Sequence, residues 1–209
     1  EPTANSVAVS NSGVGNYDIT LSGGTDDNYA FEFNSGNLEI TKKILTASAD
    51  DQSREYGESN PGFTLSFDGF IDGDNATDLV GTLPVRSTEA NTGSPVGTYD
   101  ITVSGGTDAN YIFIPMNGTL TVTRAELEVF AYGGVKNYGD DNPVFDMEIE
   151  GFKNGETTSV LTSLPVISTV ATKYSPAGTY DVIASGGVSD NYTFDYDNAT
   201  LTINKVDLS

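Results

Sequence analysis

Three aspartates stand close together in the segment DGDNATD and could bind a cation. Asp72, Asp74 and Asp78 offer carboxylate oxygens, which are the ligands that calcium takes in proteins. An EF-hand loop also needs an oxygen side chain at its fifth position and a glycine at its sixth, where this segment has Ala76 and Thr77. The segment is therefore a candidate calcium site, but it is not an EF-hand.

A second set of acids lies in a turn that occurs three times, SGG followed by three residues and Asn-Tyr. Asp26, Asp108 and Asp190 stand in the three copies, so a calcium site common to the copies would use them. The alternative is a turn capped by side chains, because Asp and Asn in turns commonly accept hydrogen bonds from nearby backbone N–H groups. We favour the capped turn. Calcium is the only cofactor that the sequence suggests.

Three tyrosines are candidates for ligand binding because they have no counterpart in the other copies. An exposed aromatic patch would suit a glycan or a protein surface. The eight tyrosines that do recur are expected to pack in the core or at its rim instead. The candidate residues are Tyr132, Tyr174 and Tyr196.

The composition excludes several classes of chemistry. The chain has no Cys, no His and no Trp, so the usual zinc sites, disulfides, cysteine nucleophiles and histidine-based triads are excluded. Paired carboxylates could still hydrolyse a glycoside. However, nearly every distinctive residue occurs two or three times, whereas an active site is a single constellation. We expect no enzyme and assign no catalytic residue.

The charge excludes several kinds of partner. The net charge is −21, from 30 acidic and 9 basic residues. So few cations could not neutralise a run of phosphates, which argues against nucleic acid and against an anionic membrane surface. The sequence also lacks an apolar run of about 18 residues, so we expect no insertion into a membrane.

The elements that position these residues come from an internal repeat. The segment 96–124, VGTYDITVSGGTDANYIFIPMNGTLTVTR, has counterparts at 14–42 and 177–205. Gly15, Gly97 and Gly178 mark equivalent points, so the period is 82 and then 81 residues. A fixed period of this size indicates an array of similar folded units.

The repeat divides the chain into four pieces. The back half of a unit is expected first, and two full units and the start of a further unit follow it. We refer to the first three pieces as the first, second and third repeats. In chain order, the pieces are residues 1–43, 44–124, 125–205 and 206–209.

Hydrophobic alternation predicts mainly strands. Tyr99, Ile101 and Val103 alternate with polar residues, as in a half-buried strand. A returning strand is expected to start at Tyr111. The pair Asn117-Gly118 before the next strand favours a two-residue type I′ hairpin turn. The only helix candidates are the short segments 75–80 and 157–161, which Asp or Thr could cap.

The last strand of one unit runs directly into the first strand of the next. The junctions read LEITKKILTASA and LTVTRAELEVFA, without a Gly/Ser-rich or Pro-rich linker. A short direct junction restricts hinge motion, so we expect an elongated, rather stiff array. The partners of each unit are then its neighbouring units.

The order of the conserved blocks resembles one known family. Both full units carry YGxxNPxF, GF, a Pro-containing GTY block, SGG, NYxF and a final strand, as in the YGX variety of MBG-type repeats of bacterial surface proteins. The resemblance implies a large secreted or cell-surface protein with an adhesin-like stalk. It also implies compact β-grasp-like units. An immunoglobulin-like β-sandwich is the alternative architecture.

The resemblance and the repeat together favour an extracellular structural spacer at the bacterial cell surface or in a fibre. The alternative is an adhesive module that binds a carbohydrate or a protein. The ragged ends suggest a further partner, because unpaired strand edges could associate end to end into filaments.

Overall fold

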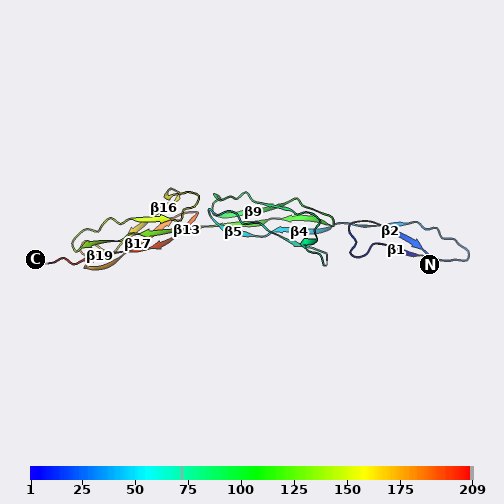
Figure 1. The fold of residues 1–209 in the computed structure, drawn as a ribbon, viewed down its shortest axis with the longest axis horizontal. Coiled ribbons are helices and arrows are strands. Elements are labelled where there is room, and N and C mark those ends of the chain that lie inside the picture. Colours follow the sequence, from blue (N-terminus) through cyan, green and yellow to red (C-terminus); the bar gives the residue numbers. More distant parts are fainter. Residues whose placement is uncertain (72, 208–209) are drawn as a thin grey trace. The chain divides into compact units, whose positions relative to one another are not determined.

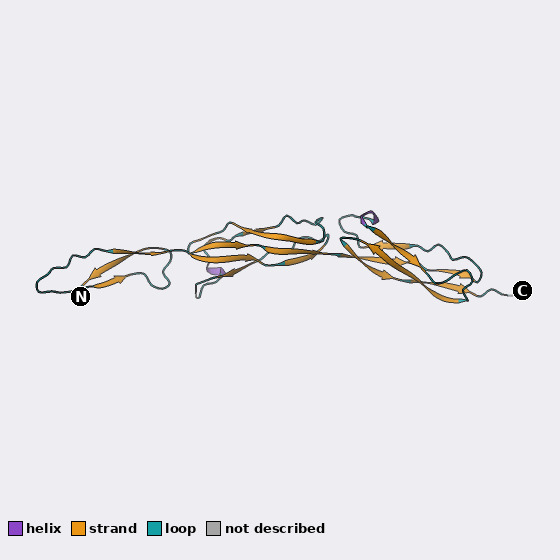
Figure 2. Ribbon diagram, turned by 180° about the vertical axis from the view of Figure 1, so that it is seen from behind, coloured by secondary structure: helices purple, strands orange, loops and turns teal. Residues whose placement is uncertain are grey.

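The computed structural model describes residues 1–71 and 73–207, and this part of the chain is mainly β (Figure 2). The expected class of small β-rich units in tandem is confirmed. The only helices among the described residues are two 3-10 turns, η1 (Ala76–Asp78) and η2 (Thr158–Val160), which fall within the two predicted segments. Asn75 and Thr157 cap them through their side chains. No helix in the described ranges is long and apolar enough to cross a membrane.

The second repeat contains two principal sheets and a two-stranded ribbon. The principal sheets have the strand orders β11-β4-β6 and β5-β12-β9-β8, and β7 pairs with β10. Figure 1 labels β4, β5 and β9. The strands are β4 (Lys43–Ala49), β5 (Gln52–Glu55), β6 (Leu65–Asp68), β7 (Gly81–Thr82), β8 (Val85–Ser87), β9 (Gly97–Ser104), β10 (Thr107–Asp108), β11 (Tyr111–Met116) and β12 (Gly118–Thr123).

The third repeat has the same arrangement of its principal sheets. Their orders are β15-β13-β18 and β14-β19-β17-β16. Figure 1 labels β13, β16, β17 and β19. The strands are β13 (Ala125–Ala131), β14 (Gly134–Asn137), β15 (Met147–Glu150), β16 (Ser163–Ser168), β17 (Gly178–Val188), β18 (Tyr192–Asp197) and β19 (Ala199–Asn204).

The core of the third repeat lies between its two sheets. Val129 and Ala131 of β13 pack against Ala184 of β17, which belongs to the other sheet. Leu201 and Val182 are fully buried on the second sheet. Two sheets packed face to face form the layers of a sandwich. In each full repeat, however, two strand pairs run parallel, β4 with β11 and β13 with β18 among them, unlike the antiparallel sheets of an immunoglobulin domain.

Consecutive strands change sheet together. β4 and β11 lie side by side in one sheet, and the strands that follow them, β5 and β12, lie side by side in the other. The third repeat does the same with β13 and β18, then β14 and β19. In each full repeat, therefore, two parallel segments of chain run side by side and pass together from one sheet to the other.

The predicted hairpin at Asn117-Gly118 is wrong. β11 starts at Tyr111 as predicted, but it pairs with β4 and not with the strand that follows it. Among the described residues other than glycine, only Asn154 has a positive φ, so Asn117 is not in a type I′ turn. Its side-chain Oδ1 instead accepts a hydrogen bond from Val103 N at 3.2 Å.

Asn117-Gly118 marks the point where the chain changes sheet. A Cβ atom on Gly118 would lie 2.4 Å from the carbonyl oxygen of Ala49, the last residue of β4. Asn198 has the place of Asn117 in the third repeat, and its Oδ1 accepts from Ala184 N at 3.0 Å. The asparagine thus satisfies a backbone N–H beside the crossing in both full repeats. Gly118 permits close approach of two backbones in the second repeat, whereas Ala199 has its place in the third.

The first repeat contains one antiparallel sheet, ordered β1-β2-β3. Its strands are β1 (Thr3–Ser6), β2 (Gly15–Ser22) and β3 (Gly36–Ile40), and they match β8, β9 and β12. Leu38 is exposed, whereas the equivalent Leu120 is fully buried. The segment of the first repeat that is equivalent to β11, residues 29–34, forms no strand.

Contacts divide the chain into two compact units, each formed by segments from more than one repeat. The first comprises Glu1–Asp50, Phe63–Thr88 and Asp100–Thr119. The second comprises Asp51–Gly62, Glu89–Tyr99 and Leu120–Ser209, of which residues 208 and 209 are not described. The junction of the first and second repeats falls inside the first unit, and the junction of the second and third repeats falls inside the second unit.

Candidate functional site: the junction between successive repeats

The strand that ends one repeat leads directly into the next. β12 ends at Thr123 and β13 begins at Ala125, so Arg124 alone separates them. At the previous junction, β3 ends at Ile40 and β4 begins at Lys43. The direct junctions predicted from the sequence are confirmed. Each junction is then held by the Asn-Tyr turn of the following repeat.

At the first junction, Asn110 binds the preceding repeat through its side chain and the first residue of β4 through its backbone. Its Oδ1 accepts from Val14 N at 3.1 Å, and its carbonyl oxygen accepts from Lys43 N at 2.9 Å. The ammonium group of Lys42 donates to the carbonyl oxygen of Asp108 in the same turn, at 2.6 Å. Hydrogen bonds from a charged donor are stronger than neutral ones.

The second junction repeats this set of contacts. Asn191 Oδ1 accepts from Val96 N at 3.0 Å, and its carbonyl oxygen accepts from Ala125 N at 3.1 Å. Arg124 Nε donates to the carbonyl oxygen of Asp190 at 3.0 Å. We call these three contacts the clasp: asparagine to two backbone N–H groups, and a junction cation to the turn.

A tyrosine and an acid stand beside the clasp in both full repeats. Tyr111 OH donates to Asp74 Oδ2 at 2.5 Å, and Tyr192 OH donates to Glu156 Oε2 at 2.6 Å. Tyr111 directly follows the clasp residue Asn110, and Tyr192 directly follows Asn191. The bond therefore ties the loop that carries the acid to the turn that forms the clasp.

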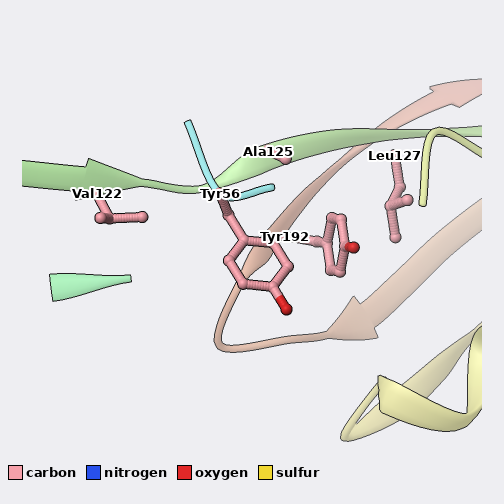
Figure 3. Packing of buried hydrophobic residues seen from close by; sticks show 5 residues of the cluster. All are labelled: Tyr56, Val122, Ala125, Leu127 and Tyr192. Carbon is pink, nitrogen blue, oxygen red and sulfur yellow. The ribbon is translucent and has the colours of Figure 1, made fainter. Parts of the chain in front are cut away.

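A second tyrosine crosses the junction between the second and third repeats. Tyr56 OH, from the second repeat, donates to Glu156 Oε1 at 2.6 Å. Its ring meets that of Tyr192 edge to face, with centroids 5.5 Å apart and planes at 85° (Figure 3). Figure 3 also shows Val122 and Leu127 on either side of this pair, in the same buried cluster. One carboxylate thus binds tyrosines from two repeats.

Glycine next to Tyr56 brings the repeats into close contact. Gly57 has φ +84°, and a Cβ atom on it would lie 2.3 Å from Cβ of Lys153 in the third repeat. Lys153 Nζ also pairs with Glu58 Oε1 at 3.1 Å. Asn154 Nδ2 donates to the carbonyl oxygen of Thr92 at 3.2 Å. The recurring Tyr-Gly pair therefore forms part of the surface by which the second repeat contacts the third.

The shared carboxylate changes the acidity of both tyrosines. The hydrogen bond to Glu156, together with burial, raises the pKa of Tyr56 above its usual value. Burial, together with the bond to Glu156, raises the pKa of Tyr192 further. A phenolate at either position would lie against a carboxylate, so the junction favours the neutral tyrosines.

Two of the candidate calcium ligands cap their own turns. One carboxylate oxygen of Asp26 accepts from two backbone N–H groups, at 2.8 and 3.1 Å. The carboxylate of Asp108 accepts from three, at 2.6 to 3.0 Å. These bonds are those of the capped-turn alternative. Calcium binding at these residues stays a prediction.

The other candidate calcium ligands that the structure describes, Asp74, Asp78 and Asp190, do not form a cluster. Asp74 binds Tyr111, and Asp78 Oδ2 accepts from Asn75 N at 2.8 Å in the capping box of η1. The backbone carbonyl oxygen of Asp190 accepts a hydrogen bond from Arg124 Nε. Ser189, not Asp190, is the residue equivalent to Asp108 in the third repeat. Asp72 lies outside the described residues. Within the described ranges, no group of three or more acids could hold a metal ion.

The three candidate tyrosines lie in different places. Tyr132 follows β13, is half-exposed, and donates to Glu148 Oε2 at 2.5 Å. Tyr196 lies on β18 and stacks on Phe194, with centroids 6.2 Å apart. Tyr174 is well exposed and lines a hollow near the end of the third repeat.

The comparison with protein families identifies the fold unit. The profile of the MBG domain (YGX type) matches residues 2–39, 45–121 and 127–202. The chain belongs to the YGX-type MBG domain family. This family consists of repeat domains of surface proteins, with structural or adhesive rather than catalytic roles. Tyr56-Gly57 and Tyr138-Gly139 are the Tyr-Gly pairs of the two full MBG repeats.

No curated protein matches the chain. A crystal structure of Drosophila N-cadherin EC1-3 matches with 12% sequence identity and a TM-score of 0.27, covering 96% of this chain and 79% of that chain. So low a TM-score does not indicate a common fold.

The sequence predicted the role of the residues at the junctions only in part. Asn110 and Asn191 recur, and they were expected to cap turns. The acids Asp74 and Glu156 are also equivalent, because they lie 82 residues apart and each stands four residues after a Gly-Phe pair. The useful signal would have been an acid at the same distance after Gly-Phe in both MBG repeats.

Proposed function

We propose that the chain is a segment of an extracellular stalk or spacer in a large bacterial surface adhesin or extracellular fibre. The clasp supports this proposal most strongly, because the same contacts join two successive pairs of repeats. Repeats joined by backbone hydrogen bonds hold their spacing better than repeats joined by a flexible linker. A spacer needs no active site, and the chain is not an enzyme in this proposal.

Labelling of intact cells tests the location. Antibodies raised against the full chain are added to cells of the producing bacterium, before and after permeabilisation. We expect labelling of intact cells and its loss after brief external protease treatment. Labelling that requires permeabilisation would contradict an extracellular spacer.

The second candidate function is an adhesive module for a carbohydrate or a protein. It is favoured by the exposure of Tyr174 and the partial exposure of Tyr132. A glycan array probed with the full chain, Tyr174→Ala and Tyr132→Ala distinguishes the two functions. The spacer predicts no specific signal. A signal that either substitution abolishes, while circular dichroism is unchanged, would establish the adhesive function instead.

Calcium and self-association are further proposals. Calcium bound by the acidic turns would stiffen the array, and end-to-end pairing would turn it into a filament. Small-angle scattering with calcium and with a chelator tests the first. Sedimentation at increasing protein concentration tests the second: a mass that stays monomeric would contradict filament formation.

A further inference from the structure

The third repeat carries a second copy of the surface that receives a neighbour at the second junction. Tyr138-Gly139 occupies the place of Tyr56-Gly57. Tyr138 N donates to the carbonyl oxygen of Asn204 at 3.0 Å, as Tyr56 N does to Thr123 at 2.8 Å. The φ angles of the two glycines are +91° and +84°. The backbone therefore presents both tyrosines in the same way.

The two copies differ in what covers them. Tyr56 is 3% exposed beneath the third repeat, whereas Tyr138 is 48% exposed. A Cβ atom on Gly139 would meet nothing within 4 Å, whereas one on Gly57 would collide with Lys153. The face around Tyr138 forms a shallow hollow lined by Tyr138, Tyr174, Pro176, Ala177, Lys205 and Val206.

The residues around this hollow are those that make the clasp elsewhere. Ala177 is equivalent to Val14 and Val96, whose N–H groups bind the asparagine side chain. Lys205 is equivalent to Lys42 and Arg124, which donate to the turn. Val206 is equivalent to Lys43 and Ala125, whose N–H groups bind the asparagine carbonyl. The face thus carries all the groups that bind the Asn-Tyr turn of the following repeat at the other two junctions.

We propose that this face binds a further repeat of the same type, joined directly after Lys205. The chemistry of the occupant follows from the second junction. It must present an Asn-Tyr turn to the N–H groups of Ala177 and Val206, and a carboxylate four residues after Gly-Phe to the hydroxyl of Tyr138. The Tyr-Gly pair of each repeat then forms part of the surface that binds the next repeat.

This inference goes beyond the proposed spacer role, because it states which residues a repeat must carry to follow another. It does not depend on an extracellular location, so labelling of intact cells can fail without affecting it. Conversely, a failure of the inference would leave the location of the chain untouched.

An extended protein tests the proposal. The sequence of residues 125–205 is added once more after Lys205 of the full chain. Tyrosines are nitrated with tetranitromethane, and the modified peptides are quantified by mass spectrometry. We expect nitration of Tyr138 to slow by about tenfold in the extended protein, because the covered Tyr56 is 3% exposed against 48% for Tyr138. Tyr56 serves as the folded reference in both proteins.

A matched variant assigns the protection to the clasp. Changing Asn191→Ala and Glu156→Ala in the added copy alone leaves residues 1–205 unchanged, and it should restore nitration of Tyr138. If Tyr138 reacts equally fast in the original and extended proteins while Tyr56 stays protected, the proposal is wrong. Protection of Tyr138 in the original protein that increases with concentration would make a second copy the occupant, which also overturns it.

Discussion

Tyr56 and Tyr192 come from successive repeats and share one carboxylate, that of Glu156, while their rings meet edge to face at 5.5 Å. Both side chains are almost fully buried. Edge-to-face aromatic pairs add about 0.5–1.5 kcal/mol to the effect of burial alone. A side chain of the second repeat thus completes a buried cluster of the third.

Replacing the shared acid should weaken the junction. Glu156→Ala leaves two buried hydroxyls without their acceptor, which typically costs about 1–3 kcal/mol. We expect a lower urea midpoint for the unfolding that tyrosine fluorescence reports, and faster hydrogen exchange at Val96 and Ala125. Glu126→Ala, at an exposed position of β13, is the matched control and should change neither. Equal effects of the two substitutions would contradict the role of Glu156.

Alkaline pH should loosen the same junction. The pKa of Tyr192 is raised in the folded chain by burial and by the bond to Glu156, so the folded state favours the neutral phenol. This contribution is fully present below the ordinary tyrosine pKa of about 10, and it is lost as the pH rises through the folded-state value. We therefore expect the melting temperature to fall more steeply above about pH 10 in the natural chain than in Tyr192→Phe.

The groups that face Tyr192 are Glu156, Tyr56 and the backbone of Lys153. Other lysines and tyrosines titrate in the same range, but they are common to both proteins, so the difference in slope isolates Tyr192. Parallel melting curves for the two proteins between neutral and alkaline pH would count against the shared carboxylate.

A buried cation differs between the two full repeats. Arg54 Nε donates to Asn60 Oδ1 at 2.7 Å. Lys136 stands at the equivalent position and binds two carbonyl oxygens, and Asn142 Oδ1 has no hydrogen-bond partner in the part of the chain that the structure describes. Lysine cannot reproduce the planar fork of arginine, so an acceptor is left over.

Lys136→Arg should therefore stabilise the third repeat by about 1 kcal/mol, since it supplies a donor to a buried acceptor. Arg54→Lys should destabilise the second repeat by about 1–2 kcal/mol for the converse reason. Thermal unfolding of both variants against the natural chain checks the pair. Shifts of the same sign would show that the asparagine contact does not decide the effect.

The sheet crossing should tolerate no side chain at Gly118. Gly118→Ala places a Cβ atom 2.4 Å from the carbonyl oxygen of Ala49 and should cost about 1–3 kcal/mol. Gly36 is the equivalent residue of the first repeat, where a Cβ atom would lie 3.6 Å from Ile19, at ordinary contact distance. Gly36→Ala is thus the control, with a change within about 0.5 kcal/mol. Equal costs in chemical denaturation would refute the close approach.

The sequence predicted which faces of strands are buried better than it predicted which strands pair. Tyr99, Ile101 and Val103 point inward along β9, as their alternation with polar residues indicates. Alternation says nothing of the neighbouring strand, however, and the parallel partner of β11 is β4, which lies far away in the sequence. Asn117-Gly118 was misleading because its residues suit a hairpin turn, although here they serve a sheet crossing.

The candidate site was predicted only in its parts. The repeat revealed the Asn-Tyr turns, the junction cations and the direct strands, but a single sequence does not show that they meet. Glu156 was not among the predicted site residues, and its partner Tyr56 lies 100 residues earlier in the chain. The clasp depends on contacts between repeats, which no pattern within one repeat encodes.

Small-angle scattering of the full chain tests the central claim, that the clasp fixes one repeat against the next. The natural protein is compared with a variant that carries Asn110→Ala and Asn191→Ala, which removes the asparagine acceptor at both junctions. The account predicts a narrower distribution of interatomic distances for the natural protein, with unchanged circular dichroism in the variant. Superimposable scattering profiles would show that the junctions bend equally well without the clasp, and would contradict the account.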